Sequence, residues 1–219
     1  MDQRSVSEAV AALRKRIASA GGVDVSLVGV TKTFGPEAWR FAQVAGCDAV
    51  GENYAQEVVA KAAEVALADR LPVHFIGQLQ SNKIKQLTGI VDVWQSVDRL
   101  SLLTEIAKRS AQSANVFLQV NVTGEEGKGG CLPAEVGELS RAAQDLGIDV
   151  VGLMTVGPTN GDPVVTRTTF RTLRTLANDQ GLRQCSMGMT GDLEIAIEEG
   201  STMVRVGSAL FGDRPSPLR

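Results

Sequence analysis

The feature that most constrains the fold is a regular alternation of short apolar bursts with helix-like segments along the 219-residue chain. Eight bursts have the length and composition of buried strands. They cover residues 25–32, 49–54, 72–77, 92–97, 115–122, 149–156, 184–189 and 203–212. The helix-like segments between them cover residues 36–45, 55–68, 82–87, 99–111, 133–146, 164–180 and 190–199. Strands that alternate with helices pair in parallel through right-handed crossovers.

Eight such strands predict an α/β fold whose sheet closes on itself, a single (β/α)8 TIM barrel that forms one domain over residues 1–219. An amphipathic segment at 5–20, closed by Gly21 and Gly22, adds an extra N-terminal helix. A doubly wound open sheet is the alternative. We favour the barrel because no G-x-G-x-x-G motif follows the first strand and because the count of eight fits closure.

Charge and apolar patterning argue against several classes of protein. The net charge is −3, which offers no basic surface for nucleic acid. No apolar run reaches transmembrane length, and the charges spread through the first 22 residues argue against a signal peptide. Cys47, Cys131 and Cys185 are far apart and odd in number, so we expect neither a disulfide framework nor a zinc site. We therefore expect a cytoplasmic protein that binds neither nucleic acid nor a membrane.

Polar side chains gather where the predicted strands end, which is where a β/α barrel carries its chemistry. Lys32 ends the first strand and shares a side with Val28 and Val30 by period-two counting, so it should point into the barrel. An inward ammonium group is costly unless it is paired or neutral. The residues alone leave two explanations open. One is an ion pair, for instance with Glu52, and the other is a Schiff base with an aldehyde.

Two glycine-containing stretches near the end of the chain are suited to an anion. The stretch SMGMTGD at 186–192 runs from a strand through small residues into a helix predicted to begin near Thr190, a candidate N-cap or phosphate ligand. An ordinary turn is the alternative. Arg205 shares a face of the next strand with Gly207, where a phosphate could approach the backbone, and a structural ion pair is the alternative for this arginine. His74, the sole histidine, lies on an apolar strand and is expected to be a core residue.

Six stretches, taken in chain order, resemble one known family. They are VTK (30–32), GENYAQE (51–57), HFIGQLQSNK (74–83), NVTGEEGKGG (121–130), GLMT (152–155) and SMGMTGDLEIAIEEGSTMVRVGSALFG (186–212). The family is that of the pyridoxal phosphate homeostasis proteins, the YggS/PROSC type. The resemblance covers nearly the whole chain. It implies a single barrel like the N-terminal domain of alanine racemase, of fold-type III, with pyridoxal 5′-phosphate (PLP) as its cofactor.

The resemblance also implies roles for single residues. Lys32 matches the lysine that forms a Schiff base with PLP, and Arg205 matches the arginine that faces the pyridine nitrogen. Asn53 lies on the cofactor rim. The residues that fall where the phosphate is held are Ser186, Thr190 and Gly207.

The chain departs from the family pattern at two positions. Phe34 stands where the family often has a second lysine, so any role of that lysine is absent here. Gly127 stands where serine is common, and we expect this change to be mild.

Arginine cannot give up its proton, so Arg205 would keep the ring nitrogen of PLP unprotonated and make the ring a poor sink for electrons.

Two functions are open at this point. The one that the resemblance implies is a non-enzymatic protein of intracellular PLP homeostasis, which holds PLP and buffers it or delivers it to PLP-dependent apo-enzymes. The other is a PLP-dependent amino-acid racemase, which needs an acid/base group on each face of the imine. Lys32 can serve one face, and racemases of the resembling fold take the second group from a tyrosine on an extra domain. The chain ends seven residues after Gly212 and Tyr54 is a poor substitute, so we expect the first function, a monomer and no catalytic residue.

Overall fold

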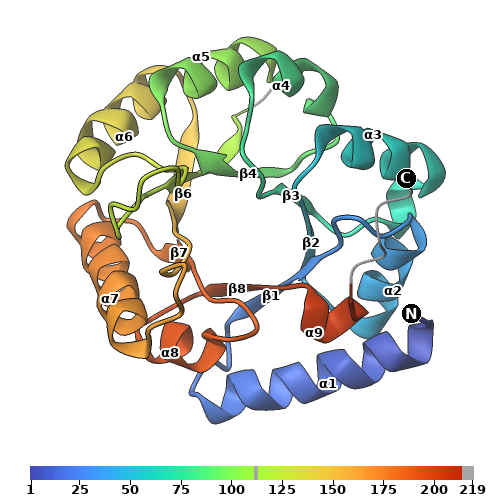
Figure 1. Cartoon of the computed structure of the whole chain (residues 1–219). Coiled ribbons are helices and arrows are strands. Elements are labelled where there is room, and N and C mark those ends of the chain that lie inside the picture. The colour runs from blue at the N-terminus through green and yellow to red at the C-terminus, as the bar shows by residue number, and fades with distance from the viewer. Residues whose placement is uncertain (111–112, 214–219) are drawn as a thin grey trace.

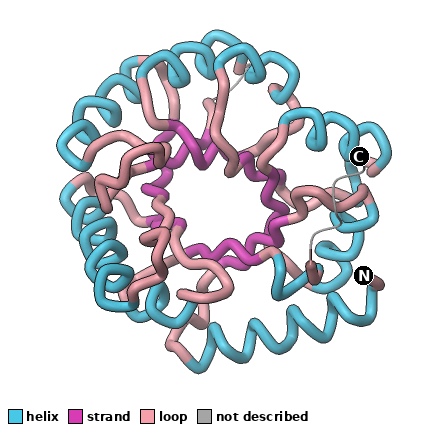
Figure 2. Tube along the Cα trace, viewed as in Figure 1, coloured by secondary structure: helices cyan, strands magenta, loops and turns pink. Residues whose placement is uncertain are grey.

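The structure is a computed structural model that describes residues 1–110 and 113–213. In these ranges eight parallel strands form a closed barrel in sequence order, with β1 paired to both β2 and β8. Helices surround the strands on all sides (Figure 1). Figure 2 shows the strands as an inner ring and the loops that link them to the helices. The predicted (β/α)8 barrel is confirmed, and the open sheet is excluded.

The strands and helices alternate as the sequence predicts, with small differences at their ends. The strands are β1 (Ser26–Val30), β2 (Ala49–Glu52), β3 (Val73–Phe75), β4 (Val93–Val97), β5 (Asn115–Gln119), β6 (Asp149–Met154), β7 (Gln184–Ser186) and β8 (Met203–Val206). The α-helices are α1 (Gln3–Ser19), α2 (Glu37–Ala45), α3 (Ala55–Glu64), α4 (Ser81–Leu87), α5 (Leu100–Arg109), α6 (Val136–Asp145), α7 (Pro163–Asp179), α8 (Leu193–Glu198) and α9 (Ser208–Phe211). Short 3-10 helices are η1 (Leu67–Asp69) and η2 (Pro133–Glu135).

Two predictions near the carboxyl end of the chain were wrong. The helix predicted to begin near Thr190 begins at Leu193, with Asp192 as its N-cap, so Thr190 lies in the preceding turn. The eighth apolar burst is two elements, because β8 ends at Val206 and the short helix α9 follows. The helix predicted over 99–111 corresponds to α5, and residue 111 lies outside the described residues.

The predicted N-terminal helix is present as α1 and packs against the outside of the barrel next to α2, α8 and α9 (Figure 1). Its first turn is capped by Asp2, whose carboxylate accepts a hydrogen bond from the N–H of Ser5 at 2.9 Å. Its buried face is made of residues at helical spacing, namely Val6, Val10, Leu13 and Ile17. None of the helices in the described ranges is long and apolar enough to cross a membrane.

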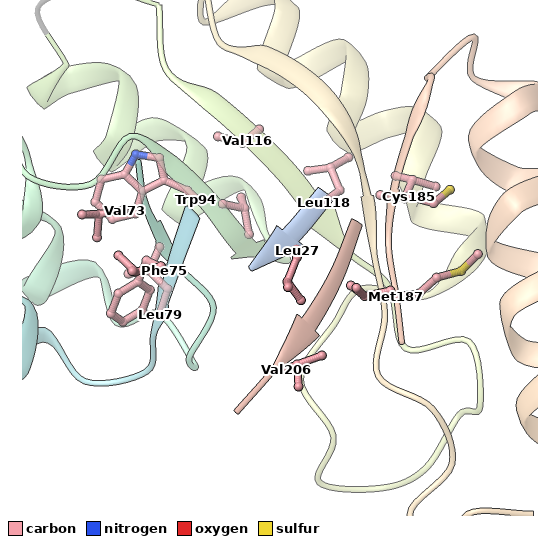
Figure 3. Close-up of a cluster of buried hydrophobic side chains, with 14 of the residues drawn as sticks. Leu27, Val73, Phe75, Leu79, Trp94, Val116, Leu118, Cys185, Met187 and Val206 are labelled. Atoms are coloured by element: carbon pink, nitrogen blue, oxygen red, sulfur yellow. The ribbon is translucent and has the colours of Figure 1, made fainter. Parts of the chain in front are cut away.

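Side chains alternate between the two sides of the barrel wall and form two separate cores. The larger core lies between strands and helices, and Figure 3 shows part of it, including Leu27, Phe75, Trp94, Leu118 and Met187. The smaller core fills part of the barrel interior and consists of Val28, Ala49, Phe117, Met154 and Met203. The rest of the interior holds polar side chains, which belong to the site described next.

Candidate functional site

A cavity of about 380 Å³ lies where the carboxyl ends of several strands meet. This is the end of a β/α barrel that carries binding sites, and the volume is within the range of small-molecule sites. Five of the six site residues predicted from the sequence line it, namely Lys32, Asn53, Thr190, Arg205 and Gly207. The sixth, Ser186, lies behind the cavity wall.

Lys32 faces the cavity, as the alternation of side chains predicted. Val28 belongs to the interior core, and Val30 and Lys32 line the cavity. The strand ends at Val30, so Lys32 lies in the following turn and not at the strand end, and it is partly buried. Glu52 shares its side of β2 with Val50 in the outer core, so this carboxylate lies on the opposite side of the wall from Lys32.

The guanidinium group of Arg205 is fixed at the inner end of the cavity. The residue is 5% exposed. Its Nη1 donates to the hydroxyl of Ser186 at 2.6 Å, and its Nη2 donates to the carbonyl oxygen of Thr155 at 2.9 Å. Burial lowers the pKa of Arg205 to about 10, and the charge of Asp192 opposes that shift. The group is therefore cationic at neutral pH and held in one orientation.

Ser186 differs from the other five predicted site residues in that it does not line the cavity. It is fully buried, accepts the hydrogen bond from Arg205 and donates to Oε1 of Gln95 at 2.6 Å. Both bonds lie within the barrel interior, and Ser186 is not among the described residues that line the cavity. The hydroxyl of Ser186 is therefore engaged on both sides, by Arg205 and by Gln95.

The hydrogen bonds of Ser186 continue across the barrel to His74. Nε2 of Gln95 lies 2.6 Å from Nδ1 of His74, and the histidine is 5% exposed. Burial lowers the pKa of His74 to about 4, so the ring is neutral at neutral pH and its Nδ1 can accept from Gln95. His74 is a hydrogen-bonded core residue, as predicted.

Hydroxyl groups and glycines from two segments form the part of the cavity suited to an anion. Thr190 and Gly191 belong to the loop before α8, while Gly207 and Ser208 lie where β8 passes into α9. A Cβ atom at Gly207 would lie 3.3 Å from the carbonyl oxygen of Val30, so a larger residue would crowd this wall. Glycines of this kind leave backbone N–H groups accessible to a phosphate.

The loop that carries Thr190 has a fixed shape. Gly188 has φ +97°, and a Cβ atom there would lie 2.5 Å from the Cβ of Ala196, so only glycine fits. The N–H of Met189 donates to Oδ1 of Asp192 at 2.6 Å. From α1, Nη2 of Arg16 donates to the carbonyl oxygen of Thr190 at 3.3 Å. The loop is therefore held by Asp192, which is the N-cap residue of α8, and by Arg16 of the N-terminal helix α1.

The remaining walls of the cavity are mainly apolar, and most of their residues carry no distinct signal in the sequence. The lining residues that it did not single out as site residues include Ile76, Met154, Val156, Met189, Gly191 and Ser208. Ser208 could have been found had the helix start after Gly207 been recognised within the apolar run. Phe34, noted only as a departure from the family pattern, also lines the cavity.

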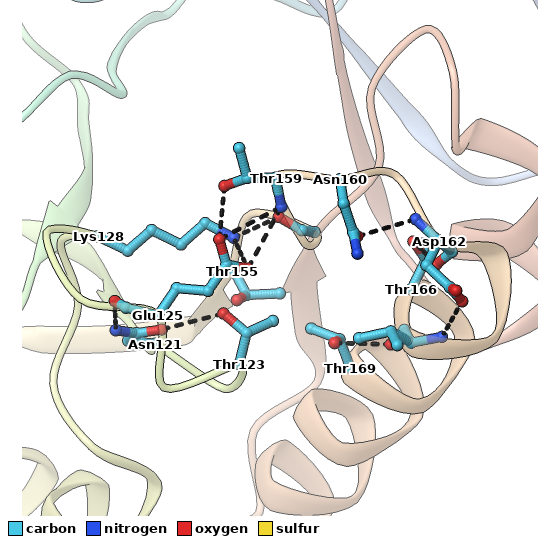
Figure 4. A network of polar contacts seen from close by, with 12 residues as sticks. Asn121, Thr123, Glu125, Lys128, Thr155, Thr159, Asn160, Asp162, Thr166 and Thr169 are labelled. Carbon is cyan, nitrogen blue, oxygen red and sulfur yellow. Dashed lines mark hydrogen bonds and ion pairs between the residues drawn. The ribbon is translucent and has the colours of Figure 1, made fainter.

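Two loops beside the cavity are tied together by a polar network (Figure 4). Nζ of Lys128 donates to Oε1 of Glu125 at 2.8 Å and to the carbonyl oxygen of Gly157 at 2.6 Å. The hydroxyl of Thr159 donates to Oε2 of Glu125. The hydrogen bond from Lys128, followed by that from Thr159, lowers the pKa of Glu125 to about 2. The loop after β5 is thus joined to the loop after β6.

The donor groups of the cavity fit one kind of molecule. A lysine amine, a buried guanidinium group and hydroxyls with accessible backbone are gathered between apolar walls. Asn53 also lines the cavity, and its Oδ1 is buried and lacks a hydrogen-bond partner among the described residues. These groups suit a flat aromatic phosphate that carries an aldehyde, a ring nitrogen and a ring hydroxyl, which is the chemistry of PLP.

Comparisons with known proteins agree with this description. The family model of the alanine racemase N-terminal domain matches residues 2–215. The pyridoxal phosphate homeostasis protein of Pseudomonas aeruginosa is 43% identical over 216 residues, which cover 94% of this chain and 93% of that protein. The homologous protein of Aquifex aeolicus is 42% identical over 198 residues, with 86% of each chain covered.

Solved structures also match this chain over most of its length. PipY of Synechococcus elongatus with PLP bound superposes with a TM-score of 0.81 at 33% identity, over 94% of this chain and all of that one. Alanine racemase of Clostridium difficile has a TM-score of 0.77 at 15% identity, and the match covers 58% of the racemase chain, so this likeness shows the fold alone. The chain belongs to the family of the pyridoxal phosphate homeostasis proteins, with the barrel fold of the alanine racemase N-terminal domain.

Proposed function

We propose that this protein binds PLP and serves intracellular PLP homeostasis by holding the cofactor and delivering it. The observation that carries the proposal is that one cavity contains the amine of Lys32, the guanidinium group of Arg205 and the hydroxyls and glycines suited to a phosphate. The PLP bound to PipY, which is 33% identical, and the names of the relatives from two bacteria support the same function.

The residues of the cavity would divide the binding of PLP among them. The amine nitrogen of Lys32 would form a C=N bond with the aldehyde carbon, and its two protons would leave with the aldehyde oxygen as water. Arg205 would face the ring nitrogen, and because it keeps its own proton it would not donate a full charge to the ring. Thr190 and Gly207 would hold the phosphate, and Asn53 would lie at the rim of the bound ring. Bound in this way, PLP supplies an electrophilic carbon and an aromatic ring that can accept electrons.

We further propose that the protein does not catalyse a reaction of amino acids. Racemisation needs a proton donor or acceptor on both faces of the substrate carbon. Of the described residues that line the cavity, only Lys32 and Arg205 have titratable side chains, and Arg205 is committed to Ser186 and Thr155. Tyr54 is 50% exposed and is not among the described lining residues. A racemase is therefore the less supported alternative.

The recipients of the cofactor, the assembly state and the compartment are also parts of the proposal. We propose that PLP-dependent apo-enzymes receive the cofactor, that the protein acts as a monomer and that it works in the cytoplasm. The thiols of Cys47, Cys131 and Cys185 are free and buried, which supports a reducing compartment. Light scattering of the purified protein after gel filtration would test the monomer, and a stable dimer would contradict it.

The experiment that tests the function has two parts. PLP-loaded protein, freed of excess cofactor by gel filtration, is mixed with the apo form of a PLP-dependent enzyme, and the recovered activity is followed against free PLP at the same concentration. In parallel, exchange of the alanine α-hydrogen is followed by proton NMR in deuterated water. We expect recovery of the apo-enzyme and no exchange near ordinary enzymatic rates of about 1–10³ per second. Exchange at such rates that Lys32→Ala abolishes would establish the racemase instead.

A further inference from the structure

The backbone next to Lys32 is held by a buried cluster of charges on the far side of the barrel wall. Glu52 at the end of β2 is fully buried, and Lys61 on α3 is 3% exposed. Nζ of Lys61 lies 2.6 Å from Oε1 of Glu52 and 3.6 Å from Oε2 of Glu57, one helical turn earlier. Oε1 of Glu52 also accepts from the hydroxyl of Thr31 at 2.6 Å. The cluster therefore lies directly behind the segment that presents Lys32.

This cluster binds the main chain on both sides of Lys32. Nζ of Lys61 donates to the carbonyl oxygen of Thr31 at 2.7 Å. The N–H of Thr33 donates to Oε2 of Glu57 at 2.7 Å. The residue before the lysine and the residue after it are thus both tied to α3, and their positions depend on two side chains of that helix.

The turn that follows Lys32 is strained. Thr33 has φ +71°, and within residues 1–110 and 113–213 it is the only residue other than glycine with a positive φ. This conformation is unfavourable for a β-branched residue and persists only where the surroundings hold it. The hydrogen bond from the N–H of Thr33 to Glu57 is such a restraint. Strain of this kind indicates that the turn is kept for the position that it gives to its neighbours.

A buried ion pair such as that of Glu52 and Lys61 is not an efficient means of stabilising a fold. Oε1 of Glu52 accepts three hydrogen bonds, from Thr31, Trp39 and Lys61, while Oε2 has no hydrogen-bond partner among the described residues. Removing two charges from water is costly, and apolar side chains of similar size often stabilise a fold at least as well. The contacts of the pair, which converge on residues 31–33, therefore point to a positional role.

We propose that Glu52, Lys61 and Glu57 are positioning residues for Lys32. They fix residues 31–33 so that the lysine amine meets the aldehyde carbon of PLP without a search through other backbone conformations. The inference rests on the proposed function and adds the groups that set the rate of bond formation. Without them, the phosphate and ring contacts remain, but the C=N bond forms roughly 10–100-fold more slowly, because a displacement of about 1 Å costs on this order.

The first test replaces the buried cation. Lys61→Met keeps the length of the side chain and removes its hydrogen bonds. The rate of C=N bond formation is followed by absorbance after mixing the protein with PLP. Affinity is measured separately for 4′-deoxypyridoxine 5′-phosphate, which has a methyl group in place of the aldehyde. We expect a rate roughly 10–100-fold below that of wild type and an unchanged affinity for the analogue.

A second pair of variants decides the matter even if Lys61→Met fails to fold. The side chain of Glu57 is 29% exposed. When Glu57 is replaced, the buried Lys61 keeps its ion pair with Glu52, so no buried charge is left unpaired. Glu57→Ala removes the acceptor for the N–H of Thr33 and should slow bond formation with the same unchanged affinity for the analogue. Glu57→Gln keeps an oxygen that can accept this bond and should restore most of the rate.

A matched control loosens the same strand at its other end. The carboxylate of Asp48 accepts from the N–H of Leu27 at 2.6 Å and pairs with Arg14 at 2.7 Å. Asp48→Ala removes both contacts; it should lower the melting temperature and leave the rate of bond formation unchanged.

Three results would overturn the proposal. They are a normal rate in Glu57→Ala, a loss of affinity for the analogue equal to the loss of rate, and an equal slowing in Asp48→Ala. If wild-type protein itself formed no C=N bond with PLP, the proposed function would fail, which is a different result.

Discussion

At the scale of single residues, the polar interior of the barrel explains how a buried arginine is kept in place. Hydrogen bonds run from Arg205 to Ser186, from Ser186 to Gln95 and from Gln95 to His74. This series of hydrogen bonds ends at the neutral imidazole of His74. The sequence identified Arg205 and the character of His74, but it could not identify Gln95, because an inward glutamine on a strand has no distinct local pattern.

The neutral state of His74 predicts a dependence of stability on pH. Its pKa falls from 6.5 in the unfolded chain to about 4 in the folded protein because of burial. Since the unfolded state binds the proton first, the free energy of unfolding is highest above pH 6.5 and declines as the pH falls toward 4. The full shift corresponds to about 3 kcal/mol. Urea unfolding at pH 7 and pH 4 should show a smaller decline for His74→Asn than for wild type, and equal declines would contradict this origin.

Binding of two ligands, PLP and pyridoxamine 5′-phosphate, distinguishes the role of Thr190 in the cavity from that of Ser186. Thr190→Val should weaken the binding of both PLP and pyridoxamine 5′-phosphate by about one to two decades, because a hydrogen bond to a charged phosphate contributes about 1.5–3 kcal/mol. Ser186→Ala loosens Arg205 and should change the absorbance of bound PLP with little effect on the affinity for pyridoxamine 5′-phosphate. If Ser186→Ala weakened both ligands as strongly as Thr190→Val, the direct phosphate role predicted from the sequence would be right.

At the scale of secondary-structure elements, helix α1 does more than cover the barrel. Nε of Arg16 donates to Oε1 of Glu194 at 2.8 Å, and its Nη2 donates to Oε2 at 3.0 Å and to the carbonyl oxygen of Thr190. The helix thereby joins α8 to the loop that lines the cavity. The sequence predicted this helix from its periodicity, but the contact with Thr190 joins segments far apart in the chain and has no local signal.

This contact predicts a modest effect of Arg16 on cofactor retention. Arg16→Gln should weaken PLP binding by roughly two- to five-fold, which is the scale of a partly exposed ion pair. The matched control on the same helix is Arg4→Gln, since Arg4 pairs with Glu8 in solvent and contacts no part of the loop in the hydrogen bonds described. Equilibrium dialysis would show the difference, and equal affinities for the two variants would contradict the role of α1.

The order and kind of the elements could be predicted well, and their ends less so. Alternating apolar bursts are strong signals because strands buried on both faces are rich in apolar residues. The end of β8 was missed because the residues of α9 continue the same apolar run. The start of α8 was misplaced because Thr190 and Asp192 are both residue types that are common at N-caps, so the sequence does not distinguish them.

At the scale of the whole molecule, closure of the barrel brings the site together. The pairing of β1 with β8 places the segment that carries Lys32 beside the strand that carries Arg205, although the two lie near opposite ends of the chain. The interior core packs on the inner side of these strands, and Glu52 and Lys61 hold Thr31, the residue directly after β1, from outside. The site is thus built on strands and braced turns, which suits a protein that retains a cofactor.

The most direct measurement is the position of the covalent bond between the protein and PLP. Purified protein loaded with PLP is reduced with borohydride, digested, and searched by mass spectrometry for the lysine that carries the reduced cofactor. We predict that the adduct maps to Lys32 and that Lys32→Ala protein, still folded by circular dichroism, yields none. An adduct on Lys83 or Lys128 in place of Lys32 would contradict the assignment of the site.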